Sequence, residues 1–319
     1  MTVQTENEYE DLLGLWADLE SGLGIILGNP GSTQEFEKRV WQYDRWMQGL
    51  LQRDTDVGLY LLFQLATNSS VGYSASHALV SAVLCHLISV ELKLEQAERN
   101  SLVHAALTMN IAMTALQDQL AGQTEKPSVE QQEAIRTHTV QGALLLANIG
   151  VADQLWLDTI SQHHDESSDK GDLRVIEPAK RLARILRMVD RYAAMISPRK
   201  SREGRSASDS MRSFITNGPE KQDEVGQALV NVVGLCPPGT YVRLDNKEVA
   251  VVMRRSSKPN HPHVAIVFTE AGVLLNPPRL HRTANSSPKI QAALAASAVR
   301  VRLNHHLILQ LGAYAAQHP

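Results

Sequence analysis

Four imidazoles and one carboxylate in the middle of the chain are of the residue types that bind divalent metals. They are His77, His138, His163, His164 and Asp190. Neutral imidazole nitrogens and carboxylate oxygens suit iron, manganese and zinc. Two such metals bridged by a carboxylate can activate water and stabilise the oxygens of a phosphodiester while it is cleaved. These residues therefore indicate metal-dependent phosphohydrolase chemistry, provided that the fold brings them together.

All five residues stand on segments with helical periodicity, and residues 73–235 are predicted to form the main helical body. Pro127 and Ser128, followed by Glu130, predict the start of one helix. A polar loop at 165–172 separates two others, and Ser197-Pro198 ends the helix that carries Asp190. The candidate ligands are thus expected on consecutive helices.

The two flanking regions differ in character. Residues 8–66 show helical spacing of apolar residues and predict a helical lead-in. Residues 241–244 and 249–253 flank Asp245-Asn246 and predict a β-hairpin, with a third strand at 263–268 and a fourth at 273–275. A final helix is expected over 287–316, interrupted near Val299.

Composition narrows the class of protein. The 319 residues carry a net charge of −3 with a sequence pI near 6.5, so nucleic acid is not the expected partner. Cys85 and Cys236 lie far apart without a second cysteine nearby, as expected for reduced core residues of a cytosolic protein. The N-terminus lacks a signal-peptide pattern, and we expect no membrane-spanning segment. A cytoplasmic location is therefore expected.

Several elements occur in a recognisable order: the helix start at 73–77, Arg-x-His at 136–138, the paired histidines at 163–164, the helix to Asp190, and Pro-x-Gly-Thr-x-Val-x-Leu near 237–244. Over roughly residues 59–268 this order resembles the HD-GYP family of cyclic di-GMP phosphodiesterases. The resemblance implies an all-α fold, an HD-type helical bundle with a helical N-terminal subdomain and a small C-terminal β element. The expected domains are 1–66, 67–235 and 236–319.

The resemblance also implies roles for the ligands. His138, His163 and His164 would bind the second metal, and His77 with Asp190 would be the surviving half of the first metal site. A three-histidine site can still hold one ion with open positions. In members with three metals a glutamate precedes the first histidine by one turn, whereas this chain has Tyr73.

The second ligand helix departs from the family pattern. The family reads roughly Leu-His-Asp-Ile-Gly-Lys, and residues 108–113 read Thr-Met-Asn-Ile-Ala-Met. Met109 stands in place of a metal-binding imidazole, and Asn110 in place of the carboxylate that bridges both metals. Because an asparagine carries no charge, two dications would repel with far less compensation. Met109 and Met113 are expected to pack as core, and His104 should face elsewhere on its helix.

The nucleotide-binding elements are also altered. Residues 165–173 hold no Gly-Tyr-Pro triplet, so the contacts of that loop cannot be carried over. Arg199 and Arg202 overlap a basic segment that contacts the phosphates of the nucleotide in the family, although a solvated charge run is an equally open interpretation. His305-His306 matches no ligand element, and we interpret it as structural.

Three functional hypotheses follow. The leading one is a catalytically impaired HD-GYP-like protein that acts in cyclic di-GMP signalling by binding this or a related nucleotide, or a protein partner. The alternative is an active phosphohydrolase with a reduced site, in which one metal is held by the three histidines and Asp190 or Asn110 positions water. The third is a pure scaffold, which gives no reason for buried imidazoles without partners. The cofactor is one divalent ion (iron, manganese or zinc) or none, and a homodimer is compatible with the sequence.

Overall fold

Helices dominate the chain in the computed structural model, which describes residues 3–68, 72–166, 172–197, 199–200, 208–211, 224–258, 260–295, 299 and 303–318. The lead-in and the first half of the bundle contain α1 (Val3–Gly28), η1 (Pro30–Ser32), α2 (Phe36–Arg53), α3 (Thr55–Asn68), α4 (Tyr73–Glu91), α5 (Gln96–Thr108) and η2 (Ile111–Met113). The second half contains α6 (Thr114–Gly122), α7 (Val129–Asn148), α8 (Gln154–Gln162), α9 (Pro178–Ile196) and α11 (Glu224–Val233). The helical lead-in and body are therefore confirmed.

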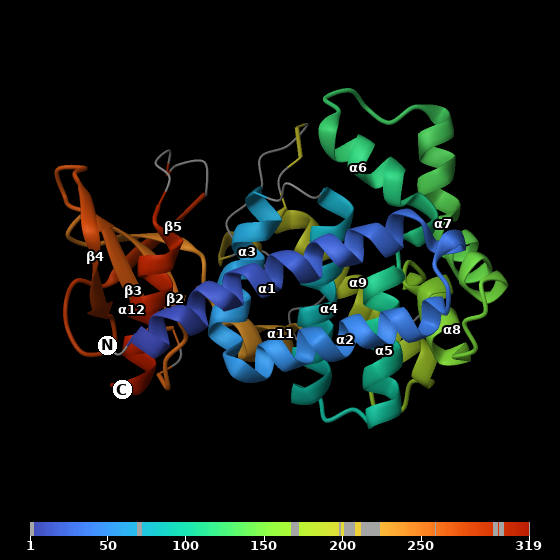
Figure 1. Ribbon diagram of the computed structural model, residues 1–319, viewed down its shortest axis with the longest axis horizontal. Helices are drawn as coiled ribbons and strands as arrows, with labels where there is room; N and C mark the ends of the chain where they lie inside the picture. The colour runs from blue at the N-terminus through green and yellow to red at the C-terminus, as the bar shows by residue number, and fades with distance from the viewer. Residues whose placement is uncertain are drawn as a thin grey trace.

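α4 is the centre of the bundle. It packs against α1, α3, α5, α6, α9 and α11, and Figure 1 shows it behind α1 and α2. It is apolar all round, as expected for a helix surrounded by others. It is also long and apolar enough to cross a membrane by length and composition, contrary to our expectation that no segment would be. However, 78% of its most apolar stretch is buried inside the protein, as in a core helix.

The C-terminal β element forms one end of the molecule, near both chain termini (Figure 1). Its strands are β1 (Tyr241–Leu244), β2 (Val249–Arg254), β3 (His263–Phe268), β4 (Leu274–Arg282) and β5 (Ile290–Leu294). They form one antiparallel sheet in the order β4-β3-β2-β1-β5. The hairpin and the third strand are as predicted, and the fourth is longer. The described sheet thus has five strands, one more than the four expected.

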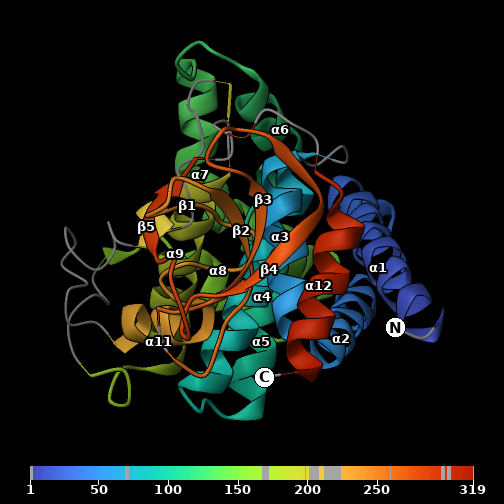
Figure 2. The ribbon, with the colours of Figure 1, turned by 90° about the vertical axis from the view of Figure 1, so that its left-hand side faces the viewer.

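β2 and β3 are buried on both faces of the sheet, which explains their continuous apolar sequences. Val242, Val252 and Ile266 belong to a small core of the sheet's own. Alternate residues such as Val251 and Met253 join the large core of the helical body. On that side the sheet packs against α3 and against α12 (His305–Gln317), as Figure 2 shows from the sheet end. The large core includes residues of all three expected domains, and the domain boundaries stay a prediction.

The expectation of one helix over 287–316 is wrong. Its first part contains β5, which pairs with β1 through Tyr241↔Leu294 and Val242↔Ala293, and the described helix α12 begins only at His305. Alanine-rich sequence favours a helix by a few tenths of a kcal/mol per residue. Pairing with the open edge of β1 satisfies backbone groups that would otherwise be left without partners. The tertiary contact therefore overrides the local preference.

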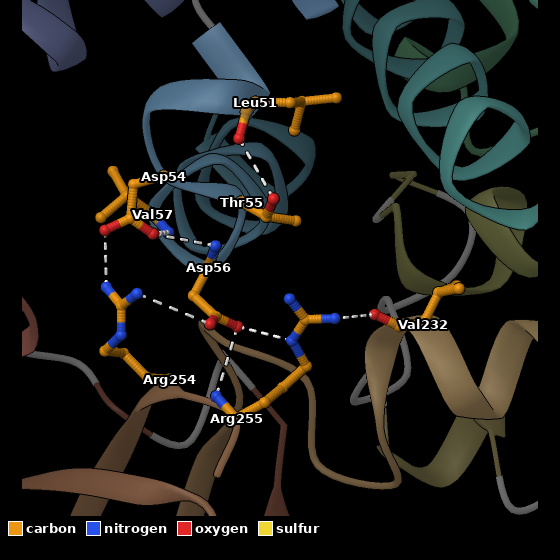
Figure 3. A network of polar contacts seen from close by, with 8 residues as sticks. All are labelled: Leu51, Asp54, Thr55, Asp56, Val57, Val232, Arg254 and Arg255. Atoms are coloured by element: carbon orange, nitrogen blue, oxygen red, sulfur yellow. Dashed lines mark hydrogen bonds and ion pairs between the residues drawn. The ribbon is translucent and has the colours of Figure 1, made fainter. Parts of the chain in front are cut away.

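Two neighbouring arginines at the end of β2 bind the sheet to the helices (Figure 3). Arg254 Nη1 donates to Asp54 Oδ2 at 2.6 Å, and Arg255 Nε donates to Asp56 Oδ1 at 2.6 Å. Asp54 also accepts from the amides of Asp56 and Val57, which caps α3. Arg255 Nη1 donates to the carbonyl of Val232 in α11. One ionic network therefore joins β2, α3 and α11.

Candidate metal and nucleotide site

The start of α7 determines where His138 lies. Ser128 and Gln131 form a capping box, so the predicted helix start is confirmed. His138 follows in the third turn of the helix and is 2% exposed. Its Nδ1 lies 2.6 Å from the carbonyl oxygen of Ile135. Because a carbonyl can only accept, Nδ1 carries the proton, and Nε2 is left with a lone pair.

α8 presents the paired histidines. The side chain of Asp153 caps this helix through the amide of Trp156, and His163 is the residue that ends it. The Nδ1 of His163 lies 2.7 Å from the carbonyl oxygen of Ile160, so its Nε2 also has a free lone pair. His163 is fully buried, whereas His164 is exposed. Only one of the pair therefore faces the interior.

The structure brings His138, His163 and His164 together. Their potential ligand atoms all lie within 4.8 Å of one another. The ring centroids are 5.3 Å apart for His138 and His163, and 4.2 Å apart for His163 and His164. The Nε2 atoms of His138 and His163 are buried and have no hydrogen-bond partner in the part of the chain that the structure describes. Two buried lone pairs that converge without a donor fit a divalent cation.

Electrostatics keep the buried imidazoles in the form that binds metals. Burial lowers the pKa of His138 below its usual range. Burial, together with the neighbouring His164, lowers the pKa of His163 to about 3. Both rings are therefore neutral near pH 7, which metal ligation requires.

His77 and Asp190 form the second part of the site. α4 carries His77 and α9 carries Asp190, and the distance from His77 Nε2 to Asp190 Oδ1 is 2.8 Å. Burial alone would raise the pKa of Asp190, but the hydrogen bond from His77 and the proximity of His163 and His164 hold it below its usual range. The carboxylate is therefore charged, and it links the pair electrostatically to the three-histidine cluster.

Tyr73 extends this part of the site toward Arg199. The ring of Tyr73 stacks on His77 with centroids 5.5 Å apart. Arg199 Nη2 donates to the Tyr73 hydroxyl at 2.9 Å, and the guanidinium carbon lies 4.8 Å from the centre of the tyrosine ring. The sequence analysis named both residues but missed this contact, since nothing in the pattern pairs positions 126 apart. Arg199 is thus held beside the candidate site.

Met109 and Asn110 lie where α5 gives way to η2. Met109 is 1% exposed and belongs to the large core. Asn110 is half-buried and lines a small internal cavity together with Ser74 and Gln117. Met113 is only half-buried, so of the two methionines Met109 alone is fully in the core. An apolar side chain therefore occupies the position at which the resemblance would place an imidazole.

Other histidines behave as expected. His104 Nε2 lies 3.2 Å from Asp44 Oδ2, between the rings of Trp41 and Trp156, and apart from the three-histidine cluster. His305 contacts the hydroxyl of Tyr60 at 2.7 Å, which is consistent with a structural role. Arg202 and residues 167–171 of the loop after the paired histidines lie outside the described residues. The role proposed for Arg202 stays a prediction.

Comparison of the chain with protein families gives no matching family model. The chain is 24% identical over 212 residues to the cyclic di-GMP phosphodiesterase PA4108 of Pseudomonas aeruginosa, a match that covers 66% of this chain. It spans about half the length of that relative, with 51% covered.

A solved structure shares the fold. Bd1817, described as an HDG"Y"P protein from Bdellovibrio bacteriovorus, superposes with a TM-score of 0.53 at 13% identity, over 71% of this chain and 72% of the other. The sequence match and this likeness in fold agree with the ordered elements of the sequence. The protein is HD-GYP-like.

Proposed function

We propose that this protein acts in cyclic di-GMP signalling as an HD-GYP-like binding protein with a reduced metal site and impaired catalysis. One observation carries the proposal: His138 and His163 each have a buried Nε2 atom without a partner among the described residues, and ligand nitrogens of both lie within 4.8 Å of one of His164. A scaffold gains nothing from such imidazoles, because each buried polar atom without a partner costs free energy.

His138, His163 and His164 would hold one divalent ion, iron, manganese or zinc. When bound, that ion supplies positive charge to the oxygens of a phosphodiester and acidifies water. Arg199, held over Tyr73, is our candidate contact for a phosphate of the nucleotide. Arg202 is a second candidate in the same basic segment. Cyclic di-GMP as the ligand follows from the named activity of the relative from Pseudomonas aeruginosa.

Impaired catalysis follows from the residues that cannot ligate. Met109 offers no imidazole, and Asn110 offers no charge to bridge two cations. In addition, His77 Nε2 and Asp190 Oδ1 already contact each other. Nucleotide binding would then change the affinity of the protein for a partner protein, and the nucleotide would not be hydrolysed efficiently.

The second candidate function is a slow one-metal phosphohydrolase. The charged state of Asp190 favours it, because a carboxylate next to the three histidines can orient water and accept its proton. Asn110 is a weaker candidate for positioning water, since it lines the cavity beside Ser74. A His138→Ala variant with unchanged turnover would refute this function.

The test measures binding and hydrolysis of cyclic di-GMP by the same preparation, in added manganese or iron. We expect saturable binding, and turnover to pGpG at least about 100-fold below that of the Pseudomonas aeruginosa relative, since loss of one stabilising group commonly costs this factor. Arg199→Gln should weaken binding, whereas Arg45→Gln, at an exposed position on α2, should not. Efficient metal-dependent hydrolysis of cyclic di-GMP would overturn the proposal of impaired catalysis. Absence of binding would overturn the proposal that cyclic di-GMP is the ligand.

A further inference from the structure

A second cleft lies at the junction of the helical body and the sheet. It holds about 860 Å³ and is lined by α11, by the end of α4 at Glu91, and by the segment that follows β2. Glu91 follows His77 by fourteen positions along α4 (Tyr73–Glu91), so these two residues are about 21 Å apart along the helix axis at 1.5 Å per residue. The cleft is therefore separate from the three-histidine site, and its volume is in the range of small-molecule pockets.

One donor of the cleft is held in a fixed position. Arg255 lines the cleft, and Asp56 and the carbonyl of Val232 bind its Nε and Nη1. Figure 3 shows its remaining nitrogen directed away from both partners, and no contact of that nitrogen is recorded within the described ranges. The side chain is 31% exposed. A guanidinium oriented in this way loses little rotamer freedom when it binds an anion.

Two further cationic or polar groups stand on the same wall. Lys258 and His261 are exposed and line the cleft, and a backbone hydrogen bond from His261 to Lys258 closes the turn between them. Neither side chain has a recorded partner in the described part of the chain. The two acidic residues of the lining are already engaged, Asp56 by Arg255 and Glu91 by Asn231. The free donors therefore favour an anionic group at this wall.

The opposite side of the cleft can accept a flat polar ring. Val230 and Leu235 supply apolar surface there, beside the amides of Gln227 and Asn231, which bond to each other and to Glu91. We propose that this cleft binds a phosphorylated small molecule of nucleotide size. Its phosphate contacts Arg255, Lys258 and His261, and its ring lies against α11. Because the cleft touches both the sheet and α11, occupancy would act on the junction between them.

The probe for this site is a fluorescent mant-GDP, titrated into chelator-treated protein so that the three-histidine site is metal-free. We expect saturable binding of mant-GDP with a Kd below about 100 µM. The double variant Lys258→Gln/His261→Gln, with both changes on exposed side chains, should bind at least about tenfold more weakly, the cost of a lost charged hydrogen bond. Lys247→Gln removes an exposed lysine paired with Glu270 on the same sheet, and should bind like the wild type. Orthophosphate should compete, and guanosine should compete more weakly than GDP, because it has the ring but lacks the phosphates.

The two cysteines provide a second measurement on unmodified protein. Cys236 is half-buried and lines the cleft, whereas Cys85 is fully buried in the core. We expect one thiol to react with a maleimide, and saturating mant-GDP to slow that reaction at least threefold. The proposal would be overturned by mant-GDP binding that does not saturate up to 1 mM, or by equal affinities of the Lys258→Gln/His261→Gln and Lys247→Gln variants. Competition by guanosine alone, or an unchanged rate of Cys236 labelling, would also overturn it.

Discussion

The two halves of the candidate site differ in what their ligand atoms already contact. In the three-histidine half, the backbone carbonyls of Ile135 and Ile160 hold the Nδ1 atoms of His138 and His163, and the Nε2 atoms have no partner among the described residues. In the other half, His77 and Asp190 contact each other at 2.8 Å.

The neighbouring residues widen this difference. Met109 is a buried apolar side chain at the position where the resemblance would place an imidazole, and the ring of Tyr73 stacks on His77. The comparison teaches that two clusters of potential ligands can differ in how far their donor atoms are already engaged. The three-histidine half has pre-oriented donors, whereas the other half is a hydrogen-bonded pair, so we expect metal to bind first at the three histidines.

Removal of His163 should have the largest effect. His163→Ala deletes a buried donor of the three-histidine half, and we expect the Kd for zinc to rise more than about 100-fold, because even an outer-shell change costs 10–100-fold. His77→Ala should change this Kd far less. Competition against a chromogenic chelator measures both values. His306→Ala, at the start of α12, is the control. Equal losses in His163→Ala and His77→Ala would remove the distinction between the halves.

Introducing the two ligands of the family pattern should allow the His77–Asp190 half to bind a metal. The double variant Met109→His/Asn110→Asp adds an imidazole and a bridging negative charge, which offsets repulsion between two cations. We expect a second bound metal per chain and turnover of cyclic di-GMP at least about tenfold above wild type. Asn110→Asp alone should give the smaller gain. A second metal without any rise in turnover would contradict the account of the impairment.

Acid should destabilise the two halves in different pH ranges. The pKa of His163 is about 3 in the folded protein and about 6.5 in an unfolded chain. Between these values the unfolded chain binds the extra proton, so the free energy of unfolding decreases as pH falls, by at most about 1.4 kcal/mol per pH unit. The pKa of Asp190 is lowered, so its contribution is lost only below about pH 4.

Urea unfolding of metal-free protein between pH 7 and 4.5 measures this dependence. His163→Gln should flatten the dependence above pH 4.5, whereas Asp190→Asn should leave it in place. The same slope in wild type and His163→Gln would show that the neutral state of His163 is not what the fold requires.

The smallest effect should come from the cap of α7. Ser128→Ala removes the capping box at the start of this helix and should lower the free energy of unfolding by about 1 kcal/mol. The three-histidine half lies more than two turns away, so metal stoichiometry should be unchanged. Thermal unfolding and elemental analysis of the same sample measure both. A loss of metal here would mean that metal content reports general stability.

Local pattern predicted the elements whose stability is local. The apolar runs of β1 to β3 and the cap of α7 depend on residues close together in the sequence, and these elements appear at the expected positions. β5 could not be predicted in the same way, because only its pairing with the edge of β1 makes its alanines a strand. The extent of the C-terminal element was underestimated for that reason.

Within the site, residue types and order predicted which side chains could meet, but not what they contact. The grouping of His138, His163 and His164 was implied by the resemblance to the HD-GYP family, and the structure places these three side chains together. The carbonyls of Ile135 and Ile160 have no sequence signature, because any residue supplies one. Whether these histidines bind a metal stays a prediction, as do the roles of Asn110, Arg199 and Arg202.

The most direct test is the metal content of protein purified without a chelator or a histidine tag, measured by elemental analysis of the wild type and of His163→Ala. The account predicts close to one divalent ion per chain in the wild type and almost none in His163→Ala. Two ions per chain, or none after incubation with iron, manganese and zinc in turn, would contradict it.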